Sequence, residues 1–562
     1  MSNEKPTPVE SNTNSDTYSL LVGMIYMFNL ILGTGALAMP AVFAKAGWLI
    51  GIFVITILCF VSFIQVTFLI EAMANANFTT KTDEYNRKKA EKYQRTKNIS
   101  LVLKSSASEP SAEKSTTLNS GVGPAVYRIK SDMSGAFRFN SMSNQSSTQM
   151  LLDQFSTLKE RFEIEEKFEL GRMTDLFLPG WQSKLFFITI MFYMYGDLVI
   201  YNTMMAKSLR ELTCTGSYNC TDPFKQDQPC WGTSPPSRYN AYRIYLVVLI
   251  ILLLPLTYLK LTKTKMIQII TIILRWAAFI SMVGITIRIF ADRDRTSVRP
   301  SLANLNGFPK MFGICVYAFM CHHSVPSLLT PIDRKQYLFY GILWNYCLIV
   351  SCYLIITLTG IFAFETIEDV YTLNFAINPC NDQMNGNQST QQLADVPVLN
   401  IFLPSYPVFT IFSSYTVIAL TLINNMTIVI GYWANVESYW LRTVLPLIAI
   451  IPPLIISLFT DNVSVVVSYV GSYTGSLLQY VFPSLLAYYS REVVQTKYLG
   501  PYIEKRLLSS NPPSDPDELD PLIIYERINP HRSPFMNNYW IYATAVWWTF
   551  SIIVVTIDHI VS

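Results

Sequence analysis

Long apolar runs dominate this chain and leave few folds open to it. Runs of about 20 residues with few charges are long enough to cross the hydrocarbon core of a membrane as α-helices. The sequence is therefore predicted to form an all-α polytopic membrane protein, with the lipid bilayer as its first partner. We read eleven spans, at about 18–43, 48–70, 183–209, 241–259, 266–290, 308–330, 337–362, 399–424, 441–459, 463–489 and 538–560.

Polar segments divide these spans into groups. Residues 1–17 form a polar tail, and loop 75–180 is rich in Ser, Thr and Lys with few aromatic residues, which predicts a disordered tether. We expect one five-helix half over 18–290, interrupted by this loop, and a second over 308–489. A loop over 490–537 and an eleventh helix over 538–562 complete the predicted organisation. The net charge of +3 suggests no nucleic-acid partner.

Loop chemistry predicts the orientation. An odd number of spans places the termini on opposite sides, and the short basic segments LKLTKTK and DRK favour a cytoplasmic amino terminus. Loops 75–180 and 490–537 are then cytoplasmic, and the C-terminus is luminal or extracellular. Two loops on that outer side carry four disulfide candidates with three open connectivities, and two glycosylation patterns. These residues are Cys214, Cys220, Cys230 and Cys380, and the acceptors Asn219 and Asn387.

The first span contains residues that weaken a helix. Gly33, Thr34, Gly35 and Pro40 interrupt the apolar run. Unwound backbone within a membrane is tolerated where it lines a cavity, because a ligand or ion can then satisfy its polar groups. Tight packing by small residues is the alternative explanation. The backbone at Leu32, Gly33 and Gly35 and the hydroxyl of Thr34 are therefore candidates for binding a ligand.

A second interruption favours the binding explanation. The sixth span reads FGICVYAFMCHHSVPSLLTPID, with Cys321, His322, Ser324 and Pro326 at its middle. It follows the first break by five spans. Two interrupted helices at corresponding positions of two five-helix halves indicate an inverted-repeat secondary transporter, whose half-helix ends face a substrate carboxylate. A zwitterionic amino acid fits this arrangement.

The motifs themselves resemble a known group. GTGALAMPAVFAKAGW resembles the first-helix motif of the amino acid/auxin permease superfamily, and YAFMCHHSVPSL resembles its sixth helix. With YMYGDLVIYN, KTKMIQIIT and HRSPF, the chain is similar to the transmembrane protein 104 family within it, over nearly all spans. The resemblance implies a leucine-transporter-like 5+5 inverted repeat with broken helices 1 and 6, plus an eleventh helix.

The resemblance also implies a cation site. Asn29 stands where the neutral amino acid branch has an asparagine linked to Na⁺ binding, and Ser413 and Ser414 resemble the hydroxyl pair of that site. Ordinary hydrogen bonding between helices is the alternative for the serines. Asp197 in the third span is a candidate for proton coupling with His322 or His323, or a structural partner of Arg275.

Several classes are excluded or left as weaker predictions. We find no nucleophile with a nearby base, no phosphate loop and no metal-ligand spacing, so we expect no enzyme, no metal and no cofactor besides Na⁺ or H⁺ as coupling ion. Glu518, Leu522 and Ile523 fit an acidic dileucine pattern that clathrin adaptors bind, and Tyr525 begins a tyrosine-based one. They favour an endosomal or lysosomal address over the plasma membrane. The predicted function is secondary amino acid transport, and the alternative is a non-transporting amino acid sensor that signals through its cytoplasmic loops.

Overall fold

The structure is a computed structural model, almost entirely helical. It describes residues 17–106, 156–214, 227–231, 234–258, 265–291, 300–364, 366–376, 397–433, 439–501, 503 and 520–561. Within these ranges, seven helices are long and apolar enough to cross a membrane, or eight if a bent pair counts as one span. The chain is thus a multi-pass membrane protein, and most described residues of the eleven predicted segments lie in helices.

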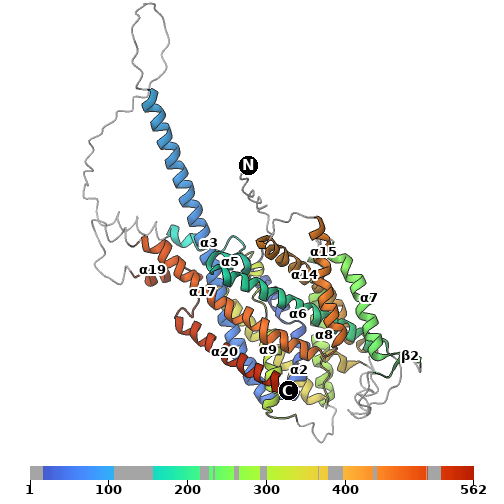
Figure 1. Ribbon diagram of the computed structural model, residues 1–562. Coiled ribbons are helices and arrows are strands. Elements are labelled where there is room, and N and C mark those ends of the chain that lie inside the picture. Colours follow the sequence, from blue (N-terminus) through green and yellow to red (C-terminus); the bar gives the residue numbers. More distant parts are fainter. Residues whose placement is uncertain are drawn as a thin grey trace, which may run out of the picture. The chain divides into compact units, whose positions relative to one another are not determined.

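The main compact unit comprises residues 1–73, 165–493 and 532–562. Most long helices follow an apolar run of the sequence to within a few residues, because hydropathy is a local property, but α3 and α14 extend further. The helices are α1 (Leu20–Ile31), α2 (Thr34–Ala46), α3 (Trp48–Ser106), α5 (Leu170–Phe177), α6 (Gly180–Thr213), α7 (Arg238–Tyr258), α8 (Lys265–Ala291), α9 (Phe308–Ala318), α10 (Val325–Leu329), α11 (Leu338–Ala363), α14 (Pro397–Trp433), α15 (Tyr439–Phe459), α16 (Val463–Val470), α17 (Phe482–Val493) and α20 (Asn538–Val561) (Figure 1).

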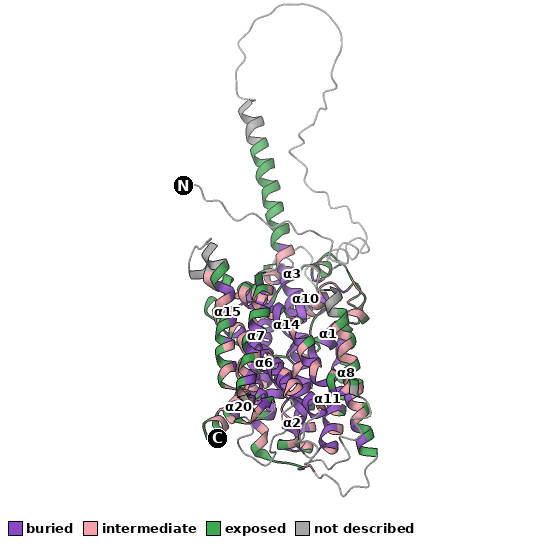
Figure 2. Ribbon diagram, turned by 90° about the vertical axis from the view of Figure 1, so that its right-hand side faces the viewer, coloured by how far each residue is buried: buried purple, intermediate pink, exposed green. Residues whose placement is uncertain are grey.

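Helix α6 lies at the centre of the packing in this unit. It contacts α14 most extensively, and also α7, α15 and α16. A second group is formed by α2, α9 and α16, and helix α11 packs on α1, α2 and α8. Buried residues line the inside of this bundle, and exposed residues lie on the outer faces of its helices (Figure 2). The exposed residues include large apolar ones such as Ile251, Ile273 and Phe550. Exposed apolar faces of this kind suit contact with lipid acyl chains.

The tenth predicted span departs from a regular helix. Between α16 and α17 the chain forms two π-helical segments, η4 (Gly471–Gly475) and η5 (Leu477–Val481). Gly471 lies against α9, where an added Cβ would come 1.9 Å from the carbonyl oxygen of Gly313. The glycine therefore permits close helix packing. Such π-helical turns often occur at functional sites.

Short elements lie outside the long helices of this unit. Strands β1 (Pro229–Trp231) and β2 (Ser234–Ser237) pair as an antiparallel hairpin before α7. A disulfide joins Cys214 at the end of α6 to Cys230 of β1, which selects one pairing among the candidates. Two 3₁₀ turns, η2 (Leu305–Gly307) and η3 (Tyr371–Phe375), precede α9 and follow α11.

A second compact unit consists of residues 74–164 and 494–531. It contains the last part of α3, the π-helical η6 (Val494–Leu499) and α19 (Pro521–Ile528). Phe78 stacks on Phe162 with ring centroids 4.2 Å apart, and the Tyr525 hydroxyl donates to Asn75 Oδ1 at 2.9 Å. Parts of loops 75–180 and 490–537 thus fold together.

This unit corrects the prediction of a disordered tether from residue 75. Helix α3 continues to Ser106, and α5 forms before the third span. Two causes sustain the helix beyond its apolar run. Asn75 and Phe78 pack against distant segments. Residues 87–95 are mostly good helix formers, and an exposed Glu84–Lys88 pair stands at spacing i,i+4. Residues 107–155 lie outside the described ranges.

Gly47, in the turn between α2 and α3, has a backbone conformation that requires glycine. Its φ is +95°, and an added Cβ would lie 2.6 Å from the backbone nitrogen of Ala303. We therefore predict that Gly47→Ala destabilises the fold by about 1–3 kcal/mol, measured by thermal unfolding in detergent micelles. The matched control is Gly284→Ala in α8, where nothing lies within 4 Å. Equal stability of the two variants would contradict the prediction.

Candidate functional site

The first break lies between α1 and α2. Helix α1 ends at Ile31, α2 begins at Thr34, and their axes differ by 50°. Leu32 and Gly33 form the turn, where the Gly33 amide donates to the Ile31 carbonyl at 2.7 Å in place of a helical bond. Backbone groups at such a break leave the regular ladder of the helix. The break predicted from the sequence is therefore present.

The second break lies between α9 and α10. Helix α9 ends at Ala318, and residues 319–324 form turns before α10 begins at Val325. The Met320 amide donates to the Tyr317 carbonyl at 3.1 Å, and the Ser324 amide to the Cys321 carbonyl at 2.9 Å. These tight turns replace the helix at the Cys-His-His-Ser segment.

A tyrosine that the sequence analysis missed joins the two breaks. The Tyr353 hydroxyl on α11 is fully buried, 2.7 Å from the carbonyl oxygen of Ile31 and 2.9 Å from that of Ala318. The hydroxyl group has one proton to donate and lies between two carbonyl groups at the broken helix ends. The two interrupted segments therefore meet at one point inside the protein. Since 322 residues separate Tyr353 from Ile31, no local pattern could have indicated this contact.

A polar cluster lies beside the two breaks. Asp197 on α6 is 3% exposed, and its carboxylate has the buried side chains of Tyr193 and Tyr317 as neighbours. The Tyr317 hydroxyl is also 3.1 Å from Thr34 Oγ1. The ring of His323 lies 5.8 Å from that of Tyr193. The structure thus brings Thr34 of the first break, His323 of the second and Asp197 together.

Carboxylate oxygen Oδ1 of Asp197 is buried without a hydrogen-bond partner. The alternative interpretation of Asp197 was an ion pair with Arg275, but no ion pair within the described residues joins the two side chains. An unsatisfied carboxylate oxygen in an apolar interior is costly unless something else binds it. A cation, a proton or an ammonium group would satisfy it.

One predicted ligand of the second break, Cys321, is held by the protein itself, whereas both ring nitrogens of the buried His322 lack a hydrogen-bond partner. Cys321 Sγ lies 3.5 Å from the hydroxyl of Tyr346 on α11, which also lies 3.0 Å from Ser62 Oγ on α3. His322 is fully buried, whereas His323 and Ser324 are partly exposed. The contact of the sulfur with Tyr346 anchors the turn, and His323 and Ser324 are more open to a ligand.

Gly35 has a clear packing role. A Cβ at this position would lie 2.6 Å from the Cα of Ala318, so α2 and α9 approach each other closely here. At Gly33, by contrast, the nearest atom would be 3.5 Å away. Of the two glycines, Gly35 fits the alternative of tight helix packing, and Gly33 leaves space beside the break.

The predicted cation ligands are Asn29, Ser413 and Ser414, and the structure describes the side chains of two of them, Asn29 and Ser414. Asn29 is 7% exposed; its amide donates to the Ile25 carbonyl, and its oxygen Oδ1 has no partner. The Ser414 hydroxyl donates to the Thr410 carbonyl of its own helix at 3.2 Å, and the side chain of Ser413 lies outside the described part of the chain. Helix α14 makes its main contacts with α6, α8, α15 and η3. The Na⁺ site stays a prediction.

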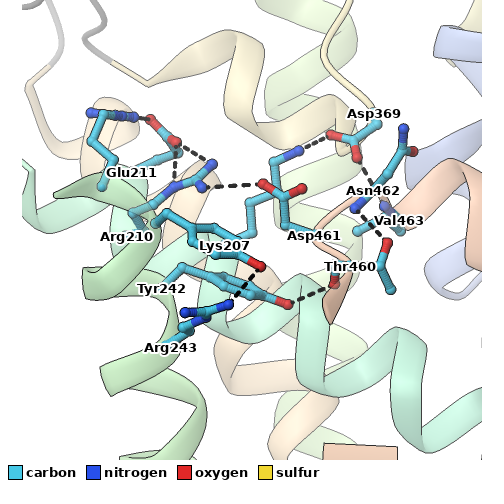
Figure 3. A network of polar contacts seen from close by, with 12 residues as sticks. Lys207, Arg210, Glu211, Tyr242, Arg243, Asp369, Thr460, Asp461, Asn462 and Val463 are labelled. Carbon is cyan, nitrogen blue, oxygen red and sulfur yellow. Dashed lines mark hydrogen bonds and ion pairs between the residues drawn. The ribbon is translucent and has the colours of Figure 1, made fainter. Parts of the chain in front are cut away.

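A buried ionic network at one end of α6 was not predicted. Lys207 pairs with Asp369, and Arg210 contacts Glu211 at 2.9 Å and Asp461 at 3.4 Å (Figure 3). Arg238 at the start of α7 also pairs with Glu211. The network ties α6 to α7 and to the loops before η3 and α16. The segment AKSLREL contains Lys207, Arg210 and Glu211. Their other partners, Arg238, Asp369 and Asp461, lie outside this segment, so no local pattern indicates the network.

The predicted sorting residues differ in accessibility. Leu522 is 44% exposed on α19 and Ile523 is partly exposed, whereas Tyr525 is fully buried. A tyrosine-based signal at Tyr525 is therefore inconsistent with its folded position. Glu518, Cys220, Cys380, Asn219 and Asn387 lie outside the described residues.

Together the apolar helices and their buried polar centre define a class, a multi-pass membrane protein with two broken helices beside a polar cluster that contains Asp197. The family model described as "Transmembrane amino acid transporter protein" matches residues 174–503. A Drosophila melanogaster protein, "Transmembrane protein 104 homolog", is 33% identical over 98% of this chain and 99% of its own length. "Transmembrane protein 104" of Gallus gallus is 32% identical over 97% of both chains, and that of Homo sapiens 32% over 98% and 99%. The chain belongs to the transmembrane protein 104 family of transmembrane amino acid transporter proteins.

Proposed function

We propose that the chain is a secondary active transporter of amino acids or similar small solutes, coupled to Na⁺ or H⁺. Substrate binds between the unwound first and sixth spans, and alternating access proceeds around them. The observation that carries the proposal is the meeting of both breaks at Tyr353, beside the partly unsatisfied Asp197. The transporter family of the chain supports the same function.

The proposed architecture has eleven spans, with five-helix halves over 18–290 and 308–489 related as an inverted repeat. Substrate contacts come from Leu32, Gly33, Thr34, Cys321, His322 and Ser324, with Gly35 shaping the break. Coupling involves Asp197, with Asn29, Ser413 and Ser414 as Na⁺ ligands. Support comes from the unpartnered oxygens of Asn29 and Asp197.

The proposed topology keeps the amino terminus in the cytoplasm and the C-terminus in the lumen or outside the cell. Glycosylation at Asn219 and Asn387 follows from it. Leu522 and Ile523 remain candidates for binding clathrin adaptors in an endosomal or lysosomal membrane, since both are at least partly exposed.

A sensor is the second candidate, and one observation favours it. Segments of the two loops that a sensor would use, 75–180 and 490–537, form a compact unit of their own. Such a unit offers a folded surface for a signalling partner, which a simple tether does not.

Radiolabelled amino acid flux in proteoliposomes tests the proposal, with Na⁺ and pH gradients imposed separately. We expect accumulation that one of the two gradients drives and that collapses when the gradient is removed. A chain that binds amino acids in a thermal-shift assay but moves none under either gradient would contradict transport and support the sensor.

A further inference from the structure

Two buried tyrosines on α11, Tyr346 and Tyr353, contact the broken spans. They stand about two helical turns apart and therefore project to the same side of the helix. Their side chains are 1% and 0% exposed. The ring of Phe319, directly after α9, packs against both, with centroids 6.1 Å from Tyr346 and 5.6 Å from Tyr353. One face of α11 therefore supports the start of the second break.

The Tyr353 hydroxyl lies at the carboxyl ends of two helices. Ile31 is the last residue of α1 and Ala318 the last of α9, and the hydroxyl is 2.7 and 2.9 Å from their carbonyl oxygens. Carbonyl groups at a helix end lack an intrahelical donor and carry partial negative charge. The Ile31 carbonyl also accepts from the Gly33 amide, whereas among the described residues no other hydrogen bond reaches the Ala318 carbonyl. Ala318 therefore depends on Tyr353 for its donor.

Further contacts fasten the two breaks to each other and to α11. Gly35 of α2 lies so close to Ala318 that an added Cβ would come 2.6 Å from the Ala318 Cα. The Tyr346 hydroxyl lies 3.5 Å from Cys321 Sγ in the second break and 3.0 Å from Ser62 Oγ on α3. Both breaks and α11 thus form one continuous set of contacts.

We propose that Tyr353 is a positioning residue, which holds the two breaks together as one body and thereby sets the affinity of the proposed substrate site. The inference rests on the proposed function. A carbonyl without a donor in an apolar interior is costly, so loss of the hydroxyl favours geometries in which the two helix ends separate. The apparent affinity falls with the fraction of protein that keeps the binding geometry. Tyr353 acts through the backbone of Ile31 and Ala318 and does not itself bind substrate.

Tyr353→Phe tests the proposal in the full chain, because phenylalanine keeps the ring and its packing on Phe319 and removes only the hydroxyl. The twenty common radiolabelled amino acids are first screened with wild-type proteoliposomes, and the one that accumulates most serves as the probe. We expect the KM of uptake to rise about tenfold, with the maximal rate within about twofold of the wild type. A merely structural role would lower the amount of folded protein, and hence the maximal rate, and leave KM unchanged.

Hydrogen–deuterium exchange in lipid nanodiscs gives a second readout that needs no substrate. We expect Tyr353→Phe to speed amide exchange at least about fivefold in both 31–35 and 318–325, because one hydroxyl restrains both segments.

Tyr242→Phe is the matched control. Tyr242 on α7 is also fully buried, and its hydroxyl also lies between two carbonyls, 2.8 Å from that of Ser457 and 3.1 Å from that of Thr460 (Figure 3). The same substitution therefore removes the same kind of contact away from both breaks. We expect a similar loss of thermal stability, with KM and the exchange of both breaks as in the wild type.

The outcomes separate this inference from the proposed function. An unchanged KM in Tyr353→Phe, or faster exchange in only one of the two segments, overturns the inference while wild-type flux upholds the proposed function. Should Tyr353→Phe fail to fold, Tyr346→Phe breaks contacts of the second break alone. Faster exchange must then reach 31–35 as well, and a change confined to 318–325 overturns the inference. Absence of flux in the wild type overturns the proposed function, and faster exchange in both segments of Tyr353→Phe then still supports their joint positioning.

Discussion

Glu71→Gln is expected to destabilise the protein by about 3–5 kcal/mol. Glu71 on α3 is fully buried and accepts two hydrogen bonds from Arg491 on α17, at 2.8 and 2.7 Å. The Ser533 amide donates to the same carboxylate at 3.1 Å, and Arg491 also donates to the Met536 carbonyl. Removing the negative charge leaves a buried guanidinium without its counter-charge. Thermal and denaturant unfolding in detergent micelles measures the loss.

The same helix supplies a matched control. Glu84 also lies on α3 and pairs with Lys88, but both side chains are well exposed. Exposed pairs contribute little, so Glu84→Gln should leave the unfolding transition in place. The double variant Glu71→Met with Arg491→Met should recover much of the lost stability, since an apolar pair of similar volume replaces the buried ions. Equal transitions for Glu71→Gln and Glu84→Gln would show that the buried pair does not form.

The helices of the fold were largely predictable, because span length and apolar content are local. The run read as 241–259 is helix Arg238–Tyr258, and the run read as 337–362 is Leu338–Ala363. Both breaks were also predictable, since glycine, threonine and proline weaken a helix wherever they stand. The helix beyond residue 75 was not, because its stability depends on contacts with segments over 400 residues away, such as that between Asn75 and Tyr525.

The residue types of the site were predictable from the sequence, but their arrangement in space was not. Thr34 and Asp197 stand out because they are polar within apolar runs, and the structure links both to Tyr317. The roles of Tyr353 and Tyr346 could not be predicted from the sequence. Tyrosine is common in apolar helices, and only the fold shows which groups these hydroxyls contact. Gly33 and Gly35 belong to one sequence motif, but Gly33 lies at the open break and Gly35 at a close contact between α2 and α9. The motif alone does not distinguish these two roles.

Asp197→Asn is expected to lower amino acid uptake at least about 30-fold while the protein stays folded. Truncating one member of a buried charged interaction costs about 2–5 kcal/mol in binding, and each 1.4 kcal/mol is about tenfold. Asparagine keeps the size of the side chain and its contacts with Tyr193 and Tyr317, so the change removes mainly the charge. Flux in proteoliposomes measures the effect, and unfolding in micelles checks the fold.

Tyr195→Phe is the control for this prediction. Tyr195 lies two residues before Asp197 on α6, but its hydroxyl donates to the Ile448 carbonyl on α15 at 2.8 Å, away from the cluster. Its loss should leave uptake within about twofold, since a net hydrogen bond of this kind contributes about 1 kcal/mol to stability and nothing to the site. If Asp197→Asn transports like Tyr195→Phe, the carboxylate neither binds substrate nor carries the coupling charge. If it retains substrate binding but loses the response to a pH gradient, its charge serves proton coupling, and the ammonium group of the substrate is bound elsewhere.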